Sequence, residues 1–300
     1  MPSRRVPPHA YFVVSAVFHY LGPAFAVLLF ARVDVLGVAW LRIASAAAVF
    51  ALWRRPWRRW ARLDRGGRRL IVGLGAVFAL MNTCFYVSID RLPLGTVAAI
   101  EFIGPIALAL LGARIPRNVA AVIVAGAGVY ILTHVRLGGQ PIGVGFAFAN
   151  AVLFTVYIVL AHRVARRAAV GGIDGLALAM LFAAVFVTPI GGWEVVGVAG
   201  DPVALLAGLG VGVSSSVIPY VTDQLAMARL PRATYALFVA LLPATATVVG
   251  VVVLRQIPSW TDVTGVVLVM IGVAVHRASD EPSRARDRKG RTPETAYPAA

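Results

Sequence analysis

IEFIGPIALAL, residues 100–110, has the apolar composition of a membrane-spanning helix, yet it contains a glutamate and a Gly-Pro pair. Pro105 cannot donate a backbone hydrogen bond to the carbonyl four residues earlier, which belongs to Glu101. The stretch therefore predicts a carboxylate and an unpaired backbone oxygen at one place, with Gly104 allowing other groups to approach closely. Because unsatisfied polar groups are costly in hydrocarbon, this place is expected to face the protein interior or a water-filled cavity.

The whole chain has the composition of a polytopic helical membrane protein. It has 300 residues, of which 59% are hydrophobic and only 14% are charged, and its mean hydropathy is +0.82. In soluble domains about 25% of the residues are charged. Long apolar runs alternate with short arginine-rich runs, and about ten segments of roughly 20 residues fit into the chain. Little of the chain remains for a soluble domain.

The apolar runs predict an all-α integral membrane protein with ten transmembrane helices joined by mostly short connections. The first run is too long for a signal-peptide core and no small-residue cleavage site follows it, so we expect it to be retained. Residues 1–9 are expected to be a cytoplasmic N-terminus, and the polar residues 278–300 a disordered cytoplasmic tail. The predicted spans are 10–30, 33–53, 70–90, 93–112, 118–134, 142–162, 174–190, 203–228, 232–254 and 260–277.

Arginines predict the orientation of these helices. With the N-terminus inside, the cytoplasmic loops carry groups of arginines, whereas the opposite loops carry single ones, Arg32, Arg91, Arg136 and Arg255. This bias predicts a multi-pass protein of the cell inner (plasma) membrane with both termini in the cytoplasm. The largest group lies between the second and third spans and consists of Arg54, Arg55, Arg58, Arg59, Arg62, Arg65, Arg68 and Arg69.

The formal net charge of +15 also raises the question of nucleic-acid binding. The arginines lie between apolar segments, however, where cytoplasmic loop charge beside anionic lipid explains them better. We therefore expect a small-molecule substrate and membrane lipid as partners, and no nucleic acid; the chain is expected to be a monomer or a homodimer. The lone Cys84 lies in an apolar segment and cannot form an intrachain disulfide.

The two halves of the chain resemble each other. RLPLGTVA at 91–98 matches RLPRATYA at 229–236, and Pro105 matches Pro243 at the same offset, since 243 − 105 = 138. If each unit has five helices, an odd number, the second begins on the opposite side of the membrane, as in the inverted-topology repeats of secondary transporters. Such proteins bind substrate near the midplane, between the repeats. The expected repeats are residues 10–140 and 141–277.

Three charged or polar groups of the first half are candidates for binding substrate or protons. Glu101 is the first, with a protonated side chain bonded to a neighbouring helix as the structural alternative. HYLGP at 19–23 repeats the spacing of EFIGP, so that Pro23 frees the carbonyl of His19 beside Tyr20, unless the proline only kinks the helix. Arg42 lies mid-way along the second span and needs a partner; Glu101 is the expected one, although Arg42 could equally serve only assembly.

The eighth span combines a helix break with a carboxylate. Pro219 frees the carbonyl of Ser215, which nearby hydroxyls could satisfy again. Asp223 follows one turn after Pro219, beside Tyr220, and is a candidate for the same polar path. Asp223 is also close enough to the cytoplasmic end of the span to reach water.

Amide and aromatic side chains one or two turns apart could line a cavity for a polar solute. The pairs are Asn82 with Tyr86 in the third span and Asn150 with Tyr157 in the sixth. Hydrogen bonds between helices are the alternative reading of these residues. No motif of a metalloprotease, serine hydrolase or nucleotide-binding loop is present, so we expect neither an enzyme nor a bound cofactor, and an ion gradient as the source of work.

At this point the sequence resembles a known family. The ten spans in two five-helix units look like the drug/metabolite transporter superfamily with paired EamA domains. YVSIDRLPLGTVAAIEFIGPIALAL, at 86–110, is most similar to its threonine/homoserine exporter branch, whose pattern here is an aromatic helix end, a Pro-Leu-Gly turn and Glu-Phe-x-Gly-Pro. Leu41-Arg42, Tyr157, and Pro219-Tyr220 followed by an acid extend the resemblance, which covers roughly residues 10–277.

The resemblance implies proton-coupled export of a small polar metabolite, above all an amino acid such as threonine or homoserine. An exporter of drugs or aromatic metabolites is the alternative within transport, and a membrane scaffold or lipid-modifying protein is the alternative from another class. Two departures concern the substrate. Relatives often have an acid before the proline of the ninth helix, where this chain has Leu242, and Gly-Glu where it has Arg255-Gln256.

Overall fold

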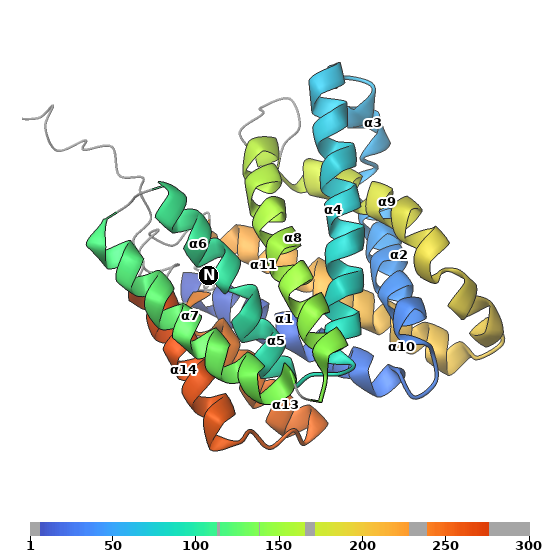
Figure 1. The fold of residues 1–300 in the computed structure, drawn as a ribbon. Coiled ribbons are helices and arrows are strands. Elements are labelled where there is room, and N and C mark those ends of the chain that lie inside the picture. Colours follow the sequence, from blue (N-terminus) through green and yellow to red (C-terminus); the bar gives the residue numbers. More distant parts are fainter. Residues whose placement is uncertain (1–6, 113–114, 138, 166–171, 228–238, 276–300) are drawn as a thin grey trace, which may run out of the picture.

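The computed structural model describes residues 7–112, 115–137, 139–165, 172–227 and 239–275. All regular elements in these ranges are helices, and most of them run side by side as in a bundle (Figure 1). The predicted tail at 278–300 lies outside the described residues. The α-helices are α1 (Pro8–Leu29), α2 (Val35–Arg54), α3 (Trp57–Trp60), α4 (Arg65–Ile89), α5 (Leu94–Glu101), α6 (Ile103–Gly112), α7 (Pro116–Leu137), α8 (Pro141–Ala165), α9 (Gly172–Gly191), α10 (Pro202–Gly212), α11 (Ile218–Met227), α13 (Leu242–Leu254) and α14 (Trp260–Val275).

Every predicted span coincides at least in part with an apolar helix of the described chain. Seven helical stretches are long and apolar enough to cross a membrane by themselves. The fourth, ninth and tenth predicted spans correspond to shorter apolar helices, Leu94–Leu108, Leu242–Leu254 and Trp260–Val275. The chain is therefore all-helical and multi-pass where it is described.

The helix that contains Glu101 is interrupted near Pro105, where the sequence predicted a break in its hydrogen bonding. α5 ends at Glu101, Phe102 is a turn residue, and α6 begins at Ile103. Pro105 lies in the first turn of α6, where its missing N–H costs little because the first N–H groups of a helix have no partner within it. A second break lies at Ala240 and Leu241, immediately before α13 and its Pro243.

The eighth predicted span is not one continuous α-helix. α10 passes into the π-helical turn η2 (Val213–Val217), and α11 follows it. Single π-turns inside α-helices are rare and occur frequently at functional sites. The 3₁₀ helix η1 (Trp193–Val198) precedes α10 and was not predicted.

The third span begins earlier than predicted, at Arg65 rather than residue 70. The carboxylate of Asp64 accepts a hydrogen bond of 2.9 Å from the N–H of Gly67 and so caps the first turn of α4. The apolar run starts only at Leu70, so hydrophobicity alone places the start of the helix one turn too late.

The helices pack in pairs drawn from both halves of the chain. α1 lies against α11, α2 and α4 against α9, α4 against α8, α5 against α13, and α7 against α14. Gly104 is one of the closest approaches: a Cβ there would lie 2.7 Å from the carbonyl oxygen of Ala151 and would collide with Thr155 on α8. This contact holds the broken helix against α8 directly beside Glu101.

Candidate functional site

A cavity of about 690 Å³ lies between the two halves of the chain. Helices α1, α2, α4 to α6, α8, α11 and α14 contribute to its walls, together with Val239 and Leu242. Of the predicted site residues, those that line it are His19, Tyr20, Pro23, Arg42, Asn82, Glu101, Pro105, Asn150, Tyr157, Pro219 and Tyr220. The structure thus brings together residues from six predicted spans.

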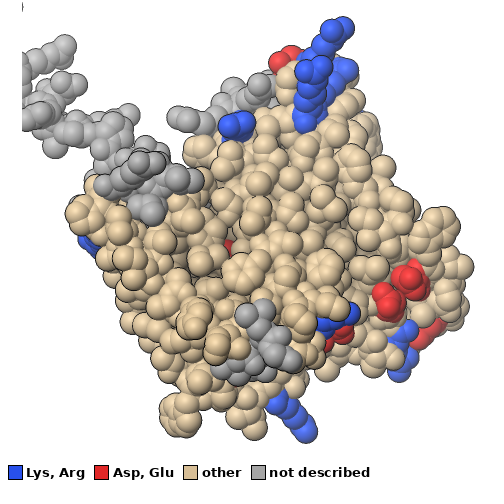
Figure 2. Space-filling view, viewed as in Figure 1, with Lys and Arg blue, Asp and Glu red and all other residues tan. Residues whose placement is uncertain are grey.

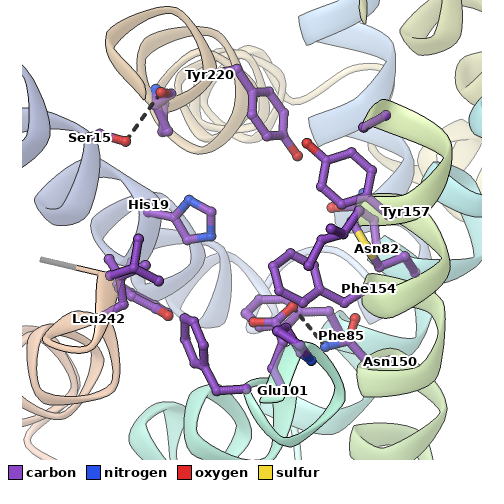
Figure 3. A pocket seen from close by; sticks show the side chains of 18 of the residues that line it. Ser15, His19, Asn82, Phe85, Glu101, Asn150, Phe154, Tyr157, Tyr220 and Leu242 are labelled. Carbon is purple, nitrogen blue, oxygen red and sulfur yellow. Dashed lines mark hydrogen bonds between the residues drawn. The ribbon is translucent and has the colours of Figure 1, made fainter. Parts of the chain in front are cut away.

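Glu101 is buried in the cavity wall, with 7% of its surface exposed. The amide nitrogen Nδ2 of Asn150 donates a hydrogen bond of 3.1 Å to its Oε1 (Figure 3). The oxygen of the same Asn150 amide, Oδ1, is buried without a hydrogen-bond partner. This end of the cavity therefore offers two acceptor groups, a carboxyl and an amide oxygen, to a ligand that carries N–H donors.

Arg42 is buried on the facing helix α2 and binds the π-turn rather than Glu101. Its Nε donates to the hydroxyl of Ser216 at 3.1 Å, and its Nη2 donates to the carbonyl of Ser215 at 3.3 Å. Among the described side chains no ion pair joins Arg42 to Glu101, contrary to the partner predicted from depth. The Ser215 carbonyl, which Pro219 was predicted to free, accepts this hydrogen bond from a guanidinium rather than from a serine hydroxyl.

Arg42 and Glu101 lie at the same distance along their helices. Each is seven residues from the first residue of its helix, since 42 − 35 = 7 and 101 − 94 = 7, which is about 10 Å along an α-helix. Tyr86, predicted to line the cavity, is fully buried just behind it, with the guanidinium carbon of Arg42 5.4 Å from its ring centroid. The cavity thus holds a cation and a carboxyl group on different walls.

The wall formed by α1 carries His19. Its imidazole projects into the open space, opposite Phe154 and Tyr157 of α8 (Figure 3). The neighbouring Tyr20 is buried, and its hydroxyl has no hydrogen-bond partner. Ser15, which sequence reasoning missed, donates a hydrogen bond of 3.2 Å to the carbonyl of Pro219 on α11.

Aromatic rings form the wall opposite His19. Tyr157 stacks on Phe154 with ring centroids 5.8 Å apart, and both Tyr157 and Tyr220 pack against Phe78. The hydroxyl groups of Tyr157 and Tyr220 point toward each other (Figure 3). The aromatic residues that sequence reasoning missed are Phe12, Phe85, Phe102 and Phe154; apolar residues carry no signal that separates a cavity wall from a lipid-facing surface.

Two other predicted residues, Gly104 and Pro243, are not among those that line the cavity. Gly104 packs against α8, and Pro243 is buried at the start of α13. Asp223 belongs to α11, but its side chain lies outside the part of the structure that is described. Among the described residues, no group of three or more His, Cys, Asp or Glu side chains could hold a metal ion.

The second half of the chain contributes apolar groups where the first half has Glu101. Val239 and Leu242 line the cavity close to the second helix break. Gln256 lies away from the cavity, and its Oε1 accepts a hydrogen bond of 3.1 Å from the N–H of Leu94 at the start of α5. Gln256 therefore caps a helix, and this structural role accounts for the residue without a part in the cavity.

The cavity extends toward one end of the bundle only. On α1 its lining runs from Phe12 to Pro23, and on α8 from Asn150 to the exposed His162. Both stretches lie on the side of the bundle where α3 and its arginines are found. None of the lining residues comes from the turns at the opposite end.

At that opposite end, a salt bridge connects the two halves of the chain. Arg32 Nη1 and Asp201 Oδ2 are 3.2 Å apart and connect the α1–α2 turn to the start of α10. The backbone N–H groups of Ala204 and Val203, together with Arg32, hold the pKa of the Asp201 carboxyl below its usual value. Asp201 is thus ionised and paired over the physiological pH range.

Comparisons with known proteins agree with this architecture. The threonine/homoserine exporter RhtA of Salmonella typhimurium (strain LT2) is 32% identical over 246 residues, which are 78% of this chain and 79% of that protein. RhtA of Escherichia coli (strain K12) is 30% identical over the same length. The model of the EamA-like transporter family matches residues 141–277.

The chain belongs to the EamA-like transporter family. This confirms the resemblance seen in the sequence and makes the protein a multi-pass membrane transporter. The fold is similar to that of a protein known from a crystal structure. The two structures superpose over 89% of this chain and 96% of the other, with 20% sequence identity and a TM-score of 0.55. At that identity the similarity shows only that this member of the EamA-like family and the other protein have the same fold.

Proposed function

We propose that this chain is a secondary transporter of the inner membrane that exports a small amino acid, such as threonine or homoserine, in exchange for protons. The observation that carries the proposal is the presence of a carboxyl group, Glu101, and a separate guanidinium, Arg42, on different walls of one cavity between the halves. A free amino acid has an ammonium and a carboxylate, and each of these groups finds a partner of opposite charge there. The names of the RhtA relatives support the substrate class.

In the proposed cycle Glu101 binds either the substrate ammonium or a proton. Substrate enters from the cytoplasm when the carboxylate is free, with Asn150 holding one of its oxygens. On the far side a proton replaces the ammonium, substrate leaves, and the protonated carrier returns to release the proton inside. Arg42 holds the substrate carboxylate with the N–H donors that Ser215 and Ser216 leave available. No cofactor takes part.

The proposed gating is a rocking of two inverted five-helix repeats against each other. The packing supports this arrangement, because equivalent helices of the two repeats make equivalent contacts. The first helices, α1 and α8, lie against α11 and α4, and the second helices, α2 and α9, lie against α10 and α4. The two helix breaks support it too, since Ala240 follows Phe102 by 138 residues, the offset of the sequence repeat.

With both termini in the cytoplasm, the described conformation is inward-facing. The cavity then extends from the depth of Glu101 to the arginine-rich cytoplasmic end, and the salt bridge of Arg32 with Asp201 closes the periplasmic end. An outward-facing state requires these two residues to separate while the walls at His162 and Phe12 approach each other.

Counterflow in proteoliposomes tests the proposal. Vesicles loaded with unlabelled threonine or homoserine and given an inward proton gradient are expected to exchange labelled substrate saturably, and Glu101→Gln is expected to abolish the exchange. Glu194→Gln is the matched control, because Glu194 is exposed on η1, away from the cavity. Normal counterflow by a well-folded Glu101→Gln protein would remove Glu101 from the mechanism.

The size and aromatic lining of the cavity favour a second candidate function, the export of aromatic metabolites or drugs. A volume of about 690 Å³ lies in the range of sites for drug-sized ligands, which are about 300–1,000 Å³. Phe154, Tyr157 and Tyr220 provide rings on which such a compound stacks. Competition of counterflow by phenylalanine, tryptophan and cationic dyes separates the two candidates: inhibition by these compounds and not by threonine would replace the amino-acid proposal.

A further inference from the structure

The arginine-rich segment between α2 and α4 is folded onto the bundle by a buried carboxylate. Asp174 at the start of α9 is 6% exposed. Its Oδ1 lies 2.7 Å from Arg54 Nη2, and its Oδ2 lies 3.2 Å from Arg59 Nε. Two of the eight arginines are therefore used to fasten the segment to α9.

Aromatic and apolar contacts hold the same segment in place. Trp60 packs on Phe182 of α9 with ring centroids 5.0 Å apart, and the guanidinium of Arg68 lies 5.4 Å from the Trp60 centroid. Leu63 belongs to the same apolar cluster as Trp60 and Phe182 and is buried, with 5% of its surface exposed. A third arginine is thus committed to internal contacts, and the segment has a defined shape.

The remaining five arginines are exposed on this ordered segment, and Figure 2 shows basic side chains gathered at this end of the molecule. The one acid within it, Asp64, caps the first turn of α4. Apolar side chains are exposed beside the arginines: Leu52 at 80%, and Trp53 and Trp57 at 53% each. The five exposed arginines are Arg55, Arg58, Arg62, Arg65 and Arg69.

We propose that this segment, residues 52–69, is a binding site for the headgroups of anionic phospholipids. A guanidinium group can donate two parallel hydrogen bonds to two oxygens of one phosphate, and basic residues next to a transmembrane helix attract anionic lipid. The exposed tryptophans are typical of the level where acyl chains meet headgroups, which a soluble phosphate ion would not require. The segment joins the ends of α2 and α4, so a bound lipid holds two walls of the cavity at the membrane surface.

Lipid binding by the purified full-length protein tests this site without measuring transport. The variant Arg55→Gln/Arg58→Gln/Arg62→Gln/Arg65→Gln/Arg69→Gln is compared with the same five positions changed to Lys. Each basic group near an anionic surface strengthens binding about fivefold, so losing contact with two or more lowers phosphatidylglycerol affinity by about 25-fold or more. The Lys variant is expected to retain most of the affinity, and phosphatidylcholine to bind the Gln variant and the native protein alike.

Two controls keep the proposal falsifiable. The double variant Arg58→Gln/Arg62→Gln changes only exposed side chains and is expected to lose part of the phosphatidylglycerol binding. It therefore tests the site even if the variant with all five arginines replaced fails to fold. Phosphatidylglycerol binding that is equal in the native protein and the double variant overturns the site. Competition by inorganic phosphate at the concentration of the lipid overturns the assignment to a membrane lipid.

Discussion

Arg42→Gln isolates the contact that we assign to the substrate carboxylate. Arginine has five N–H donors. Two of its bonds are made within the protein, to Ser216 and to Ser215, which leaves three donors for a ligand. Glutamine keeps most of the length and a polar end but has no positive charge.

The expected magnitude follows from the number of bonds lost. A hydrogen bond to a charged group contributes about 1.5–3 kcal/mol, so one lost carboxylate contact weakens binding by about 10- to 140-fold. An amine that lacks the carboxylate has no such contact to lose. For threonine and its decarboxylated analogue 1-amino-2-propanol, the variant is therefore expected to lower the affinity for threonine and leave that for the amine nearly unchanged.

Isothermal titration of both compounds to both proteins in detergent measures this difference as a double-mutant cycle. Arg117→Gln is the matched control, because Arg117 is outside the cavity and donates to the carbonyl of Val275 at 2.6 Å. Equal losses for threonine and the amine, with a coupling free energy near zero, would refute the assignment and leave Arg42 as a packing residue of the π-turn.

Four further outcomes are expected. In a Cys84→Ser background, cysteines in place of Arg32 and Asp201 are expected to form a cross-link that stops counterflow until reductant is added; full exchange by the cross-linked protein would contradict the periplasmic closure. Because the pKa of Asp201 is lowered, its pairing with Arg32 is present above the ordinary carboxyl pKa and is lost only as the pH falls through the lowered value. At the end of the bundle that this salt bridge joins, acidification from about pH 7 to pH 5 should therefore not change how fast a cysteine is labelled relative to a fully exposed reference cysteine, since the falling thiolate fraction slows both alike. Arg255 has a φ of 55°, so Arg255→Gly should stabilise the protein by about 1 kcal/mol in thermal unfolding, and a loss of stability would contradict it. Gly104→Ala should cost about 1–3 kcal/mol by pushing α6 away from α8, which unchanged melting would refute.

The helix break at Glu101 was predictable because its cause is local. Pro105 acts on the residue four positions earlier, and no distant part of the chain is needed to infer it. The position of Arg42 inside its helix was predictable for the same reason, from its place within an apolar run. Its partners were not: a count along the helix gives depth but not the direction in which the side chain points, and Ser215 lies 173 positions away.

The features that could not be predicted from the sequence depend mostly on contacts between helices. Asn150 was predicted as a lining residue, but its bond to Glu101 depends on how α8 packs against α5, which no periodicity specifies. The π-turn beside Arg42 likewise has no signal of its own in a run of three serines. The early start of α4 is different, because Asp64 is a recognisable capping residue whose signal the hydrophobic pattern concealed.

Glu101 is the only carboxylate among the described residues that line the cavity, and this has an electrical consequence. In the proposed cycle one carboxyl site exchanges one proton for one zwitterion, so each cycle would carry one positive charge inward and generate a current. The membrane potential then adds about 2.3 kcal/mol per 100 mV to the work available, and each pH unit adds about 1.4 kcal/mol. Together, 100 mV and one pH unit sustain an outward substrate gradient of about 400-fold.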